Sequence, residues 1–138
     1  MLDSAKNRYR DKIRAKHLSD ISKWENSFMF VTEEMQFLDK ILSIDIFESN
    51  IPNLYERLQQ FLKNLQDIKK EEKDLKIEVE KHKAKLSDQL ELNEAQKFSA
   101  IKESHAQLKK KNKVFRKKYL DLKLEIFNFT GNILKKSS

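Results

Sequence analysis

The sequence predicts an all-α protein, an elongated antiparallel up-down-up three-helix bundle whose helices each span about 40 residues. Apolar residues recur at alternating steps of three and four in three long segments, which is the 3.5-residue period of helices that pack against other helices. Glycine and proline occur once each and 37% of the residues are charged, a composition typical of long amphipathic helices. The 138 residues therefore form a single domain, residues 1–138.

The first helix is expected over about residues 4–44. Its apolar stripe consists of Ile21, Trp24, Phe28, Val31, Met35, Leu38 and Leu42. The period fails after Ser43, in a segment with turn-forming residues. Pro52 is expected in the first turn of the second helix, where its missing N–H costs nothing.

The second helix is expected over about residues 52–89 and the third over about residues 94–132, followed by a disordered tail at 135–138. The second stripe consists of Leu54, Leu58, Phe61, Leu65, Ile68, Leu75, Val79 and Leu86. The third consists of Phe98, Ile101, Leu108, Phe115, Tyr119, Leu122, Ile126, Phe129 and Ile133. Glu72 and His82 interrupt the second stripe, and His105 and Asn112 interrupt the third.

The stripes can face one another in a single register. With turns near residues 48 and 92, Ile21 lies level with Leu75, and Leu75 lies level with Leu108. The same register places Trp24, Glu72 and Asn112 in one layer. We expect Glu72 to accept hydrogen bonds from the Trp24 indole and the Asn112 amide, because a buried polar group without a partner costs about 1–3 kcal/mol.

Three histidines also fall on the core stripes. His17 and His105 share a layer with Val79, and His82 lies one layer away. The first interpretation is that these polar layers fix the register of the bundle. The alternatives are a metal site, since three histidines can bind zinc, and a pH-sensitive site, since charged imidazoles at one level would oppose bundle closure. No metal and no cofactor is part of the prediction.

Two surfaces are candidates for binding. The first is apolar, lies off the core stripes, and comprises Phe30, Phe37, Ile41, Ile44, Leu120, Leu124 and Phe127. Leu124 lies nearly opposite the core stripe, so it should be exposed in a monomer. The second is a basic strip without an acidic residue: Lys109, Lys110, Lys111, Lys113, Arg116, Lys117 and Lys118. It could contact a phosphate backbone, or form a solvated face neutralised in part by acids of the second helix.

The sequence predicts a protein that acts by binding. It has no cysteine, no nucleophile elbow, no Gly-rich phosphate loop and no metalloprotease motif, so we expect no enzyme and no small-molecule substrate. No apolar run is long enough to span a membrane, and we expect a cytoplasmic protein. The expected function is that of a coiled-coil interaction or scaffold protein whose partner is a second copy of itself or another helical protein. The alternative is a non-specific nucleic-acid-binding protein that uses the basic strip.

Overall fold

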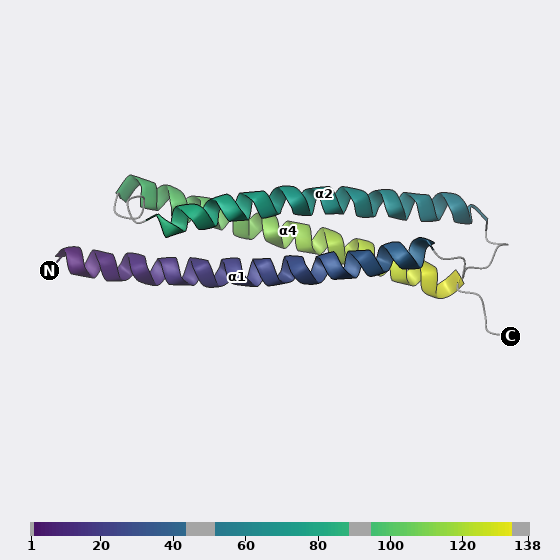
Figure 1. The fold of residues 1–138 in the computed structure, drawn as a ribbon, viewed down its shortest axis with the longest axis horizontal. Coiled ribbons are helices and arrows are strands. Elements are labelled where there is room, and N and C mark those ends of the chain that lie inside the picture. Colours follow the sequence, from purple (N-terminus) through teal and green to yellow (C-terminus); the bar gives the residue numbers. More distant parts are fainter. Residues whose placement is uncertain (1, 44–51, 89–94, 134–138) are drawn as a thin grey trace.

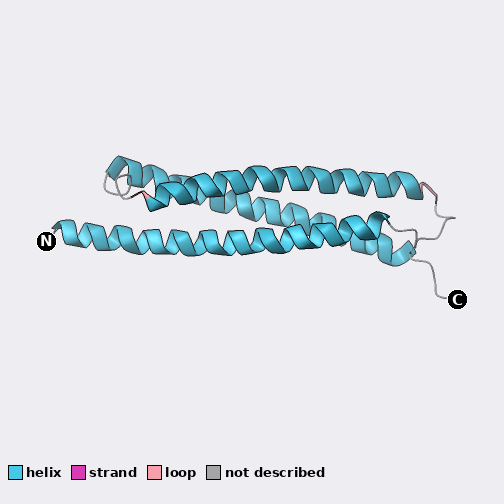
Figure 2. Cartoon of the chain, viewed as in Figure 1, coloured by secondary structure: helices cyan, strands magenta, loops and turns pink. Residues whose placement is uncertain are grey.

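The computed structural model describes residues 2–43, 52–88 and 95–133. Within these ranges the chain forms three helices: α1 (Leu2–Ser43), α2 (Leu54–Ser87) and α4 (Ala95–Ile133). They lie side by side in an elongated bundle in which α2 runs opposite to α1 and α4 (Figure 1). Helix accounts for almost all of the described chain (Figure 2). The predicted all-α three-helix bundle is confirmed.

The helix boundaries differ from prediction mainly at the start of α2. Pro52 lies in a turn before this helix, and the cap is Asn53, whose φ of 57° is left-handed. Asparagine tolerates that conformation better than most residues, and the Asn53 carbonyl accepts the first helical hydrogen bond from the Arg57 N–H at 3.0 Å. The predicted position of Pro52 inside the first turn is therefore wrong by two residues. The predicted residue Ile44 and the tail at 135–138 lie outside the described residues.

The core follows the three predicted stripes. Ile21, Leu65 and Ile126 are completely buried, and Phe28 packs edge-to-face on Phe115 with ring centroids 6.1 Å apart. Each helix thus buries one face against the other two, which supplies most of the stability of such long helices.

The contacts between helices are unequal. Helix α2 packs closely along both α1 and α4, whereas α1 and α4 make few contacts with each other. A groove of about 430 Å³ runs between them, lined by residues that include Asp20, Trp24, Lys109, Lys113 and Arg116. We call this the α1–α4 groove.

Candidate interaction face and histidine cluster

The predicted apolar surface lies on the outer side of α1 and α4. Phe37 and Leu124 are 56% and 58% exposed. The exposure of Leu124 agrees with its predicted position nearly opposite the core stripe. Its other exposed members are Phe30, Leu120 and Phe127. Ile41 is half-buried, and Ile44 is not described. We call the five exposed residues Phe30, Phe37, Leu120, Leu124 and Phe127 the apolar face.

An ion pair shows that the two halves of the apolar face flank the same seam. Glu34 on α1 accepts a hydrogen bond at 2.7 Å from Lys123 on α4. Glu34 lies one helical turn from both Phe30 and Phe37. Lys123 lies one turn from Phe127, whose ring centroid is 5.8 Å from the Lys123 ammonium. Residues three or four apart are neighbours on a helix surface, so the aromatic residues border the pair on both sides.

The same seam contains a buried tyrosine, Tyr119. The sequence pattern placed it in the core stripe but gave no hydrogen-bond partner for its hydroxyl. The Tyr119 hydroxyl donates to Glu34 Oε1 at 2.6 Å, and Lys123 donates to the other carboxylate oxygen. Burial alone would raise the pKa of Glu34, but the hydrogen bonds from Lys123 and Tyr119 outweigh it and hold the pKa below its ordinary value. We call Tyr119, Glu34 and Lys123 the tyrosine cluster.

The residues of the basic strip fall into two sets, those that form an ion pair and those that do not. Lys111 and Lys118 pair with Glu78 and Glu71 of α2 at 2.9 and 2.7 Å, and Lys117 pairs with Asp121 of its own helix. The remaining members, Lys109, Lys110, Lys113 and Arg116, make no ion pair with the described part of the chain. Only this second set is available to an anionic partner, and three of its four members line the α1–α4 groove.

The predicted hydrogen bonds of the Trp24–Glu72–Asn112 layer are wrong. Glu72 Oε1 accepts from the Thr32 hydroxyl at 2.7 Å and pairs with Lys76 at 3.1 Å. The Asn112 amide donates to the Leu108 carbonyl of its own helix. The Trp24 ring stacks on His105, with centroids 5.0 Å apart.

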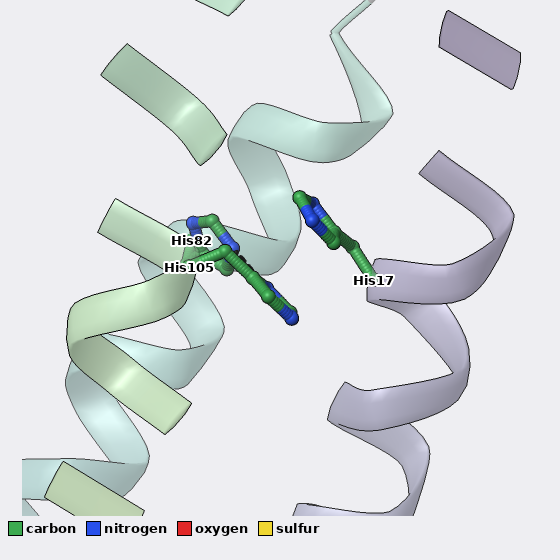
Figure 3. A group of neighbouring side chains, drawn as sticks. All are labelled: His17, His82 and His105. Atoms are coloured by element: carbon green, nitrogen blue, oxygen red, sulfur yellow. Dashed lines mark hydrogen bonds between the residues drawn. The ribbon is translucent and has the colours of Figure 1, made fainter. Parts of the chain in front are cut away.

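The three histidines lie closer together than their layers indicated. His82 Nε2 is 2.9 Å from His105 Nδ1, and the rings of His17 and His105 are stacked with centroids 3.6 Å apart and an interplanar angle of 9°. Figure 3 shows the three side chains entering one space from three different helices. All three are buried. We call His17, His82 and His105, with the Asp20 carboxylate that contacts His105, the histidine cluster.

The lean of helical side chains explains both differences from the predicted layers. Each Cα–Cβ bond tilts toward the N-terminus of its helix, so side chains on antiparallel helices lean in opposite directions. His82 on α2 leans toward the level of Val79, while His17 and His105 lean toward the level of His82, and the three converge. Trp24 and Glu72 belong to the same predicted layer, on helices that run in opposite directions. The same tilts therefore carry these two side chains apart.

Asp20 is the member of the cluster that the sequence analysis missed. Its Oδ2 is 2.9 Å from His105 Nε2, across the gap between α1 and α4. Asp20 follows His17 by three residues, so it lies on the same side of α1 one turn later. An acid one turn from a core histidine was therefore the available signal.

The hydrogen bonds fix where the protons are. His105 donates its Nε2–H to Asp20, so His105 Nδ1 carries a lone pair. That nitrogen accepts a hydrogen bond from the Nε2–H of His82. That leaves His82 Nδ1 as a buried lone pair without a donor, and His17 Nδ1 is also buried without a partner among the described residues. Burial, together with the neighbouring His105, lowers the pKa of both His17 and His82 to about 4, so both rings are neutral at pH 7.

Among the described residues, the three histidines are the one group whose nitrogens are close enough to hold a metal ion together.

Comparisons of the chain with protein-family models, with curated proteins and with solved structures gave no match. In the described ranges, no helix has an apolar stretch long enough to cross a bilayer.

Proposed function

We propose that this chain is a non-enzymatic interaction or scaffold protein that self-associates through the apolar face. The observation that carries the proposal is the exposure of five large apolar side chains on α1 and α4. Three of them are phenylalanines, and aromatic residues are enriched at protein interfaces. A contiguous exposed apolar surface costs solubility unless a partner covers it.

A second copy of the chain suits this face because of its charges. The chain carries a formal net charge of +7, which disfavours bringing two copies together at most surfaces. The seam beneath the apolar face contains one acid and one base, Glu34 and Lys123, already paired with each other. Two such faces related by a two-fold axis would bury apolar side chains against each other without adding like charges.

Leu124→Asp tests this proposal. We expect the wild-type chain to be a dimer by light scattering at two protein concentrations and at low and high salt. Leu124→Asp should raise the dimer dissociation constant about 100-fold, because each dimer loses two buried leucines worth roughly 1.5 kcal/mol apiece. Helix content by circular dichroism should not change, because Leu124 is outside the core.

Val114→Asp is the matched control. Val114 lies on the same helix and is 55% exposed, but it borders α2 rather than the apolar face. It should leave the dimer intact. A wild-type chain that is monomeric under all four conditions, or equal effects of the two substitutions, would reject self-association through this face.

The runner-up proposal is a non-specific nucleic-acid-binding protein. What supports it is the set of four basic-strip residues without an acidic partner among the described residues, Lys109, Lys110, Lys113 and Arg116. Three of these line a groove that also contains the Asp20 carboxylate, which would repel a phosphate backbone. The apolar face is therefore the better supported surface.

A further inference from the structure

We propose that the histidine cluster is a binding site for one divalent transition-metal ion, with His17, His82 and His105 as ligands and Asp20 as a positioning residue. Imidazole nitrogens suit zinc and its first-row neighbours, and a three-histidine set with an open fourth position is a known zinc arrangement. Zinc is the ion that we take as the probe, because it is redox-inert and accepts a tetrahedral set of three imidazoles and one further ligand. This inference is independent of the self-association proposed above.

The nitrogens have nearly the required spacing. One nitrogen from each histidine can be chosen so that all three lie within 4.8 Å of one another. Zinc–nitrogen bonds of 2.0–2.1 Å in a tetrahedron place neighbouring nitrogens about 3.4 Å apart. The 2.9 Å between His82 Nε2 and His105 Nδ1 is below this value, and the other spacings are at most 4.8 Å. Small movements of the side chains are therefore needed to bring the set to its bound geometry.

Asp20 supplies the outer contact that metal-binding histidines need. A ligating histidine almost always donates its second N–H to a carboxylate, a carbonyl or water, which fixes the ring and its tautomer. His105 Nε2–H already donates to Asp20, so His105 presents Nδ1 to the other two rings. The carboxylate also offsets part of the charge that an ion would bring into the core.

The cluster is poorly explained as a purely structural layer. His17 Nδ1 and His82 Nδ1 are both buried and lack hydrogen-bond partners among the described residues. A register-fixing polar layer is favourable when its groups are satisfied, and each orphaned group costs about 1–3 kcal/mol. The cluster therefore leaves buried hydrogen-bonding groups unsatisfied, which a layer that only fixes the register would not do.

Binding requires a defined movement of His17. An ion lies close to the plane of each imidazole that it binds, but the rings of His17 and His105 are nearly parallel, with their centroids 3.6 Å apart. His17 must therefore rotate out of the stack. The ion also replaces the hydrogen bond between His82 and His105, and His82 then carries its proton on the nitrogen that does not bind.

The surroundings allow access and favour neutral ligands. Asp20 lines the α1–α4 groove and its side chain is 20% exposed, so an ion can reach the cluster from this side. The three rings are buried, which disfavours a charged imidazole, and a metal ion binds the neutral form. Lys16, Lys85 and Lys109 contribute opposing positive charge, which weakens the affinity.

The test is calorimetric titration of the untagged full chain with Zn²⁺ after removal of metals with a chelator. We expect one ion bound per chain and a higher melting temperature. Co²⁺ in its place should give the visible absorption of a tetrahedral site. Asp20→Asn should weaken binding about 10- to 100-fold without loss of helix content, and His105→Ala should abolish it.

Asp11→Asn is the matched control, because Asp11 is an exposed aspartate on the same helix. It should bind Zn²⁺ like the wild type. The proposal is overturned if the wild-type chain does not bind Zn²⁺ at micromolar concentration. It is also overturned if Asp20→Asn and Asp11→Asn bind alike, or if several ions bind per chain and His105→Ala does not reduce their number. Should His105→Ala fail to fold, the Asp20→Asn comparison and the Co²⁺ spectrum decide alone.

Discussion

The tyrosine cluster and the histidine cluster both connect α1 to α4 with buried or half-buried polar groups, but they differ in how those groups are satisfied. In the tyrosine cluster each Glu34 carboxylate oxygen accepts one hydrogen bond, from Tyr119 and from Lys123. In the histidine cluster two imidazole nitrogens have no hydrogen-bond partner among the described residues. The first arrangement is complete in itself and stabilises the seam. The second leaves buried nitrogens unsatisfied beside three converging rings, and we therefore propose a ligand for it and none for the first.

The largest effect is expected from Tyr119→Ala. The Tyr119 ring is 1% exposed, and removing an aromatic ring from a core costs about 3–5 kcal/mol through lost burial and the cavity left behind. The free energy of unfolding from urea titrations followed by circular dichroism measures this loss.

Tyr119→Phe separates the hydroxyl from the ring. It should cost about 1–2 kcal/mol, because only the hydrogen bond to the Glu34 carboxylate is lost and Lys123 still pairs with that group. If the two substitutions cost the same, the hydroxyl rather than the ring would be what stabilises this part of the seam.

A smaller, pH-dependent effect is expected from Glu34→Gln. At pH 7 the substitution should cost about 1–2 kcal/mol, because Lys123 loses its charged acceptor. The pKa of Glu34 is lower in the folded than in the unfolded chain, so the unfolded state binds more protons as the pH falls below the ordinary glutamate pKa. The stabilisation is therefore present above that value and is lost as the pH falls through the lowered pKa.

Urea titrations at pH 7 and at about pH 3 measure this difference, and the gap between the wild type and Glu34→Gln should narrow at the lower pH. The exposed neighbour Glu33 gives the control, since Glu33→Gln should be nearly neutral at both values. A Glu34→Gln cost that does not change with pH would show that the carboxylate charge contributes nothing to the seam.

The comparison of the clusters also shows what sequence periodicity can and cannot predict. The heptad-like stripes were sufficient for the three helices and for the buried core, because the burial of apolar residues depends mainly on which side of a helix they occupy. They also placed Leu124 on the exposed side, where the structure has it.

Hydrogen-bond partners were not predictable in the same way. A layer assignment gives the level of each Cα, whereas polar contacts depend on where the side-chain tips reach. Opposite tilts on antiparallel helices carried Glu72 to Thr32 instead of Trp24, and brought His82 to His105. Partners on the flank of a stripe, such as Asp20 and Glu34, are not part of the apolar pattern at all.

The smallest effect on stability, and the clearest difference between the clusters, is expected from His17→Leu in the metal-free chain. His17 makes a ring stack but has an orphaned Nδ1, so an apolar side chain should be neutral or stabilising within about 1 kcal/mol. His82→Leu is the matched comparison and should cost about 1–3 kcal/mol, because His105 Nδ1 would lose its donor. Both variants should lose the stabilisation by Zn²⁺. If His17→Leu destabilises the metal-free chain as much as His82→Leu does, the stacked ring holds the bundle together, and the orphaned nitrogen no longer distinguishes this cluster from the tyrosine cluster.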